Sequence, residues 1–257
     1  MLRIITGRSG GGKTREMLSL MRKSENSIYI VQDQNSFSAE KLITSAFGMS
    51  GMGYPSVYSF RRLAYYFEEL YGSGGGENLT GASRVMVLGD IVMRLSGKLS
   101  LFGGSARRGE MASEAAGIIT TFKQYGVTKE KLERAIEKTK SPLLEKKLKD
   151  CMMIADAYEE FLKTGYRDSD DLLEGLCRNI EEKDYLNGKD VFIDSFTSFT
   201  PLEYAVIERM LYKCNSVTVA LCAAGDGDEF VADNKTKMRL EALCRERRKR
   251  ILAHLVR

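Results

Sequence analysis

The chain has 257 residues, of which 43% are hydrophobic and 29% are charged, and its formal net charge is +4. This length is enough to bury a sizeable core, in one large domain or in one domain that carries an insertion. No apolar run approaches the ~18 residues of a membrane span, the N-terminus has no signal-peptide pattern, and the five cysteines form no C-x-x-C pair. We therefore expect a cytoplasmic protein with reduced thiols and no membrane segment, zinc site or iron–sulfur cluster.

A complete phosphate-binding loop signature, G-x-x-x-x-G-K-[ST], lies between an apolar run and a helical pattern near the N-terminus. Its glycines allow backbone N–H groups to point at a polyphosphate, its lysine supplies a cation, and its threonine offers a hydroxyl ligand to Mg²⁺. We therefore predict that ATP and Mg²⁺ bind here, the alternative being a glycine-rich turn with an incidental Lys-Thr pair. The predicted loop consists of Gly7, Arg8, Ser9, Gly10, Gly11, Gly12, Lys13 and Thr14.

Two further strands are expected at 27–31 and 56–59, each followed by a helical pattern. Ligands of an open parallel sheet lie beyond the carboxyl ends of its strands, so the residues after each strand belong to the functional edge. Arg61 and Arg62 lie in the first turn of the helix after the third strand, where the helix dipole disfavours cations. Either an anionic partner or water surrounds them.

Residues 78 to 180 show one helical pattern after another, without a detectable repeat. Ser141 followed by Pro142 predicts the start of a long amphipathic helix. The lysine and glutamate runs at 130–138 and 145–150 are interpreted as solvated helix faces. We therefore predict a helical insertion.

The strand and helix alternation returns with an apolar strand at 191–194, a capping box from Thr200 to Glu203 and a buried strand at 217–222. Alternating strands and helices predict parallel pairing. The predicted fold is an α/β P-loop NTPase (RecA-like) with a parallel sheet, helices on both faces and an inserted all-helical subdomain. Its boundaries are 1–77 and 185–257 for the P-loop domain and 78–184 for the insertion.

Asp194 ends one of these strands and is a candidate Mg²⁺ ligand together with Thr14, unless it is only a turn residue. The next residue is Ser195, where an ATP-driven motor carries glutamate, and serine is no comparable base at neutral pH. ATP binding is therefore better supported than rapid turnover, and no catalytic residue is assigned.

The order of these motifs resembles AddB, the family of B subunits of the bacterial ATP-dependent helicase/deoxyribonuclease. The resemblance covers the N-terminal segment from Leu2 to Thr14 and three later stretches, at 31–40, 58–64 and 192–203. It implies a superfamily 1 helicase-like domain with a helical insertion, acting in recombinational repair of DNA double-strand breaks beside an AddA-type partner that carries the motor. It also implies that Ser59, Phe60 and Arg61 lie near the DNA strand.

Members of that family are several times longer than this chain, with a second helicase-like half and a C-terminal nuclease domain, so we expect a fragment, a truncated product or a split relative and no nuclease activity here. The basic run 245–250 is interpreted as part of an unfinished terminal helix. Two other functions stay open. One is a free-standing P-loop kinase or NTPase in which Arg107 and Arg108 close on phosphates, and the other is an interaction scaffold with a vestigial loop.

Overall fold

The computed structural model describes residues 1–48, 54–72, 76–79, 81–105, 109–223, 231–246 and 251–255. The chain forms two compact units, which we call the sheet unit (Met1–Tyr71 and Leu173–Arg257) and the helical unit (Gly72–Leu172). The sequence placed these boundaries at 77/78 and 184/185. Helix α8 (Leu172–Glu182) falls almost wholly in the sheet unit, where Glu181 forms a 2.8 Å salt bridge with Arg209.

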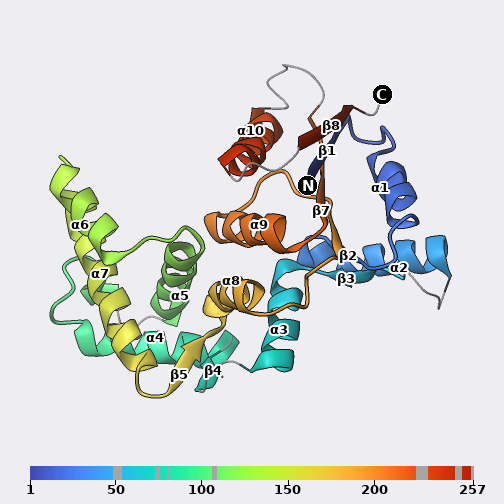
Figure 1. Cartoon of the computed structure of the whole chain (residues 1–257). Helices are drawn as coiled ribbons and strands as arrows, with labels where there is room; N and C mark the ends of the chain where they lie inside the picture. Colours follow the sequence, from blue (N-terminus) through green and yellow to red (C-terminus); the bar gives the residue numbers. More distant parts are fainter. Residues whose placement is uncertain are drawn as a thin grey trace. The chain divides into compact units, whose positions relative to one another are not determined.

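The core of the sheet unit is a six-stranded parallel sheet with the strand order β3-β2-β6-β7-β1-β8 (Figure 1). The strands expected near the N-terminus and at 27–31, 56–59, 191–194 and 217–222 are confirmed to within one residue at each end. The strands are β1 (Leu2–Thr6), β2 (Ser27–Ile30), β3 (Ser56–Tyr58), β6 (Asp190–Ile193), β7 (Ser216–Leu221) and β8 (Ile251–Leu255).

The C-terminal part of the sheet corrects the expectation of an unfinished helix. Helix α10 (Val231–Glu246) precedes β8, which pairs with β1 in parallel, with Leu2 opposite Ile251. A five-residue apolar run such as 251–255 fits a buried strand and a helix turn equally well by periodicity, which explains the error. Residues 247–250 of the basic run lie outside the described residues.

Helices cover both faces of the sheet (Figure 1). On one face Met17 and Met21 of α1 and Ile43 of α2 pack against strand residues that include Ile5 and Phe192. On the other face α9 packs against β7 and α10 against β1. The capping box at Thr200 and Glu203 starts α9 as predicted. The helices of this unit are α1 (Lys13–Met21), α2 (Ser36–Phe47), α3 (Phe60–Tyr71), α8, α9 (Pro201–Lys213) and α10 (Val231–Glu246), with a 3-10 turn η1 (Asp33–Asn35).

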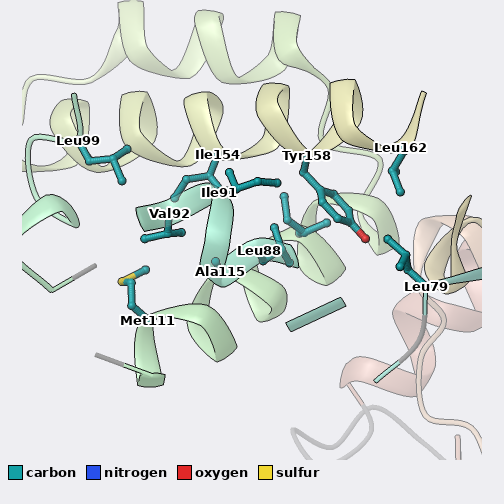
Figure 2. Packing of buried hydrophobic residues seen from close by; sticks show 11 residues of the cluster. Leu79, Leu88, Ile91, Val92, Leu99, Met111, Ala115, Ile154, Tyr158 and Leu162 are labelled. Atoms are coloured by element: carbon teal, nitrogen blue, oxygen red, sulfur yellow. The ribbon is translucent and has the colours of Figure 1, made fainter. Parts of the chain in front are cut away.

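The helical unit has an apolar core of its own, which Figure 2 shows between α4, α5 and α7. Leu88, Ala115 and Tyr158 are completely buried there. Ser141 caps α7 by accepting a hydrogen bond from the Leu144 N–H, as the Ser-Pro pair predicted. The helices are α4 (Gly81–Leu95), α5 (Gly109–Gln124), α6 (Lys129–Lys138) and α7 (Pro142–Leu162), with 3-10 turns η2 (Gly103–Ser105) and η3 (Ser169–Asp171).

This unit is not all-helical as expected, because β4 (Glu77–Leu79) and β5 (Tyr166–Asp168) pair in parallel. Each strand has only three residues, too few to show an alternating pattern in the sequence. A buried ion network lies beside them, in which Arg84 contacts Asp168 at 3.5 Å and Asp170 at 2.7 Å. Within the described ranges, no helix has the length and apolar character needed to cross a membrane.

Candidate functional site

The segment between β1 and α1 is a tight loop whose geometry depends on its glycines. Gly10 and Gly12 have φ angles of 75° and 88°, in the left-handed region that other residues rarely adopt. A Cβ atom at Gly11 would lie 3.0 Å from the Arg8 carbonyl oxygen, which accepts the Gly11 N–H bond of the same turn. Glycine is therefore the residue that this tight turn accommodates without strain at positions 10 and 12.

Lys13 is the first residue of α1, and its ammonium group is turned back onto the loop. Its Nζ donates to the carbonyl oxygens of Gly7 at 2.9 Å and Arg8 at 2.8 Å, and lies 3.2 Å from the Cys222 sulfur. An ammonium group has three donors, so these three contacts use all of them. A phosphate that binds Lys13 must therefore replace part of this set.

Thr14 and Asp194 meet although 180 residues separate them along the chain. The Thr14 hydroxyl donates to Asp194 Oδ2 at 3.0 Å, and Asp194 is only 7% exposed. The second carboxylate oxygen, Oδ1, accepts the N–H of Ser195 at 2.7 Å. Ser195 has a φ of 71°, the only positive φ outside glycine among the described residues. The two side chains predicted as metal ligands thus form one oxygen-rich pair.

Tyr29 of β2 is a third member of this group that the sequence did not reveal. Its hydroxyl donates to Asp194 Oδ2 at 3.0 Å, and the side chain is 2% exposed. Burial raises the pKa of the Tyr29 phenol, and the charge of Asp194 and the hydrogen bond to it raise it further. The phenol therefore stays protonated at neutral pH and remains a donor to the carboxylate.

A cavity of about 270 Å³ opens beside this group, between the strand ends and α2. Of the described residues that line it, Asp194 is the only acidic one, and the remaining lining is neutral. Its residues are Thr14, Tyr29, Val31, Asn35, Ser38, Ala39, Leu42, Asp194 and Ser195.

Asp233 of α10 supports the other side of the loop. Its Oδ1 accepts the N–H of Cys222 at 3.2 Å, directly after β7, and the residue is 5% exposed. Burial raises the pKa of Asp233, whereas the Cys222 N–H bond and the charge of Lys13 lower it. Lys13 thus has a buried carboxyl group in its electrostatic neighbourhood, a feature that no motif in the sequence marks.

Two of the three DNA-contact candidates are buried in the sheet unit. Ser59 is 2% exposed, donates to the Asp33 carboxylate, and accepts the Arg62 N–H at 3.1 Å as the cap of α3. Phe60 is 3% exposed and packs edge-on against Phe196. Arg61 is exposed, with its guanidinium 5.9 Å from the Tyr65 ring centre. Arg107 and Arg108 lie outside the described residues.

A family model described as "ADDB, N-terminal" matches residues 4–255, nearly the whole chain. The chain belongs to the AddB N-terminal family. The resemblance inferred from the sequence motifs is thereby confirmed. The loop, Thr14, Tyr29 and Asp194 all lie inside the region that the AddB model matches.

Curated relatives of this AddB chain are named as the B subunit of an ATP-dependent helicase/deoxyribonuclease. The protein of Desulforudis audaxviator is 33% identical over 262 residues, covering 95% of this chain and 22% of the relative. That of Clostridium acetobutylicum is 32% identical over 250 residues, covering 93% and 22%. That of Geobacillus thermodenitrificans is 32% identical over 236 residues, covering 86% and 20%. The chain thus spans about a fifth of the length of these relatives.

Proposed function

We propose that this chain is an ATP-binding, helicase-like P-loop (RecA-like) region of a helicase/deoxyribonuclease subunit that acts on DNA in recombinational repair. The observation that carries the proposal is the 3.0 Å contact between Thr14 and Asp194 at the end of a glycine loop. Threonine hydroxyl and aspartate carboxylate oxygens are the hard donors that Mg²⁺ prefers. The strand order is compatible with a shared metal site. Strand β7 lies between β1, which precedes the loop, and β6, which precedes Asp194, and the Thr14 and Asp194 side chains are in contact across it.

The residues present fit Mg²⁺ and ATP. Gly11 permits the tight turn, in which a Cβ would lie 3.0 Å from the Arg8 carbonyl oxygen, and Lys13 lies where it can exchange loop carbonyls for phosphate oxygens. Thr14 would hold the metal directly and Asp194 would hold its shell, with Tyr29 fixing the carboxylate. When bound, Mg²⁺ would neutralise phosphate charge.

Turnover by this site is proposed to be slow or absent. Hydrolysis needs a group that orients or deprotonates the attacking water, and among the described residues lining the cavity Asp194 is the only carboxylate. Asp194 already accepts hydrogen bonds from Thr14, Tyr29 and Ser195. Motor activity would then belong to an AddA-type protein, and the proposed partners are DNA and that motor protein.

Thermal melting with and without Mg-ATP tests the nucleotide site in two variants that each lose one positive charge. Ligand at about 100 times Kd adds roughly 2.7 kcal/mol, which corresponds to about 5–10 °C for a chain of this size. We expect this shift for the wild type and for Arg15→Gln, an exposed neighbour on α1, but not for Lys13→Gln. Equal shifts in both variants would contradict the site, and no shift in the wild type would favour the vestigial scaffold.

A free-standing kinase remains a second candidate, because the cavity beside Asp194 has room for a small acceptor. It predicts a phosphorylated small-molecule product, detectable by mass spectrometry after incubation with Mg-ATP. ATP binding without any such product, across a metabolite mixture, would exclude it.

A further inference from the structure

The segment from Lys129 to Lys149, which comprises α6, the turn after it and the first part of α7, has an excess of positive charge. Between Lys129 and Lys149 the sequence has eight basic residues and four acidic ones, a formal charge of +4. The whole chain also has a net charge of +4, so the remaining residues contain 31 basic and 31 acidic side chains and sum to zero. The remainder of α7 adds four acidic residues and no basic one, so α6 and α7 together have a formal charge of zero. The excess of positive charge is therefore confined to the part of this α6–α7 hairpin from Lys129 to Lys149.

Internal pairing accounts for three of the eight basic side chains. Lys129 pairs with Asp156 at 2.6 Å, Lys149 with Glu145 at 2.6 Å, and Lys131 donates to the Gly126 carbonyl at 2.7 Å. The other five form no salt bridge with any residue that the structure describes. They are Arg134, Lys138, Lys140, Lys146 and Lys147, and all five are exposed.

Four of these lysines surround the turn of the hairpin, and we call them the basic tip: Lys138, Lys140, Lys146 and Lys147. Helices α6 and α7 pack against each other, and only residues 139–141 connect them (Figure 1). Lys138 ends α6 and Lys147 is the sixth residue of α7, so at about 1.5 Å per residue all four lie within about 8 Å of the turn along the helix axes. The tip therefore presents four exposed lysines close to one turn, none of which forms a salt bridge with a residue that the structure describes.

We propose that the basic tip binds the phosphate backbone of duplex DNA without reading its sequence. Lysine is a compact cation that contacts phosphates without the planar fork that reads a base edge. Binding of single strands usually combines a basic surface with aromatic side chains on which bases stack. Residues 129–149 contain no aromatic residue, and Leu143 and Leu144 are the large apolar side chains exposed at the turn. The surface therefore fits a duplex better than a single strand.

The choice of DNA rests on the proposed function, since the relatives are named as helicase/deoxyribonuclease subunits. The exposure of the tip lysines agrees with the interpretation of these runs as solvated helix faces, and the proposal adds a binding role to that surface. A solvated face normally balances its charges through helix neighbours, as Lys149 does with Glu145, whereas the tip lysines have no such partners among the described residues.

The test compares two quadruple variants with the same charge change. One replaces the basic tip (K138Q, K140Q, K146Q and K147Q), and the control replaces four exposed lysines elsewhere (K23Q, K98Q, K163Q and K235Q). Binding of a labelled duplex of arbitrary sequence is measured by fluorescence anisotropy at several salt concentrations. Each phosphate contact contributes about 0.9 to the slope of log K against log salt concentration.

We expect the magnitude of that slope to be about 3–4 smaller for the tip variant than for the wild type, and its duplex affinity at about 0.1 M salt to be at least tenfold lower. The control variant should lose less than about threefold in duplex affinity. The proposal would be overturned if both variants lost the same duplex affinity, or if the wild type bound no duplex. It would also be overturned if the wild type bound a single strand more tightly than a duplex and the tip variant retained that binding. Tip-dependent binding to phosphatidylserine vesicles with unchanged duplex binding would overturn it as well. The Mg-ATP melting shift should persist in both variants, which keeps this test separate from that of the nucleotide site.

Discussion

Replacing Tyr29 with phenylalanine removes a single hydroxyl group from the buried centre of the site. That hydroxyl donates to Asp194 Oδ2 at 3.0 Å, and the ring is enclosed by the sheet and its covering helices. A hydrogen bond to a charged group contributes about 1.5–3 kcal/mol. We therefore expect Tyr29→Phe to lower the free energy of unfolding by about 2 kcal/mol, or the melting temperature by about 4–8 °C.

Urea unfolding of the single variants and of Tyr29→Phe combined with Asp194→Asn forms a double-mutant cycle. The two substitutions should be coupled by about 1 kcal/mol or more, because residues joined by a hydrogen bond are not independent. Tyr54→Phe is the control, since that half-exposed hydroxyl hydrogen-bonds to Thr44 at the surface, and it should change stability by less than about 0.5 kcal/mol. Additivity of the Tyr29 and Asp194 effects within about 0.5 kcal/mol would refute the role of the phenol in holding the carboxylate.

Three other changes test the surrounding structure. Asp150 is fully buried and accepts three hydrogen bonds from the backbone N–H groups of residues 100–102. Asp150→Ala should therefore lower the free energy of unfolding, measured in urea, by about 3 kcal/mol or more. A loss below about 1 kcal/mol would contradict this role. Burial raises the pKa of Glu203 above its ordinary 4.5, so the unfolded chain releases this proton first. The free energy of unfolding of the wild type should thus fall relative to that of Glu203→Gln as pH rises through 4.5 towards the pKa of the folded state. Urea titrations between about pH 4 and 7 that show the wild type gaining stability relative to the variant would contradict this. Gly12→Ala should cost about 1–2 kcal/mol because of its left-handed backbone and abolish the Mg-ATP shift, whereas Gly117→Ala inside α5 should be neutral or stabilising.

Local signals in the sequence were reliable where a few adjacent residues determine the structure. Thr200 and Glu203 form the predicted capping box, and Ser141 caps the helix that Pro142 begins. The glycine loop also follows its strand and precedes its helix as predicted. These features depend on backbone chemistry within one turn, so no knowledge of the tertiary fold was needed.

Features that depend on pairing between distant segments could not be read in the same way. Tyr29 reaches Asp194 because β2 pairs with β6 in a register that places Tyr29 opposite Phe192. The sequence shows only a tyrosine in a short apolar strand. The three-residue strands β4 and β5 pair across 89 residues, and neither is long enough to alternate visibly.

The DNA-contact candidates illustrate a different limit. The family resemblance implies that Ser59, Phe60 and Arg61 lie near the DNA strand, but a motif that matches in sequence does not show which of its side chains are exposed. The first two point into the unit, where they cap and anchor α3, and only Arg61 reaches the surface. Conversely, the lysines of the basic tip come from two helices and the turn between them, and only the structure shows which lysines of this segment form salt bridges among the described residues.

The most direct measurement is calorimetric titration of ATP into the wild type and Asp194→Asn, each with Mg²⁺ and with EDTA. A metal-dependent nucleotide site at Thr14 and Asp194 predicts that Mg²⁺ strengthens ATP binding by the wild type at least tenfold and changes binding by the variant less than threefold. Equal Mg²⁺ dependence in the two proteins would contradict the role of Asp194. Absence of ATP binding by the folded wild type would contradict the nucleotide site itself.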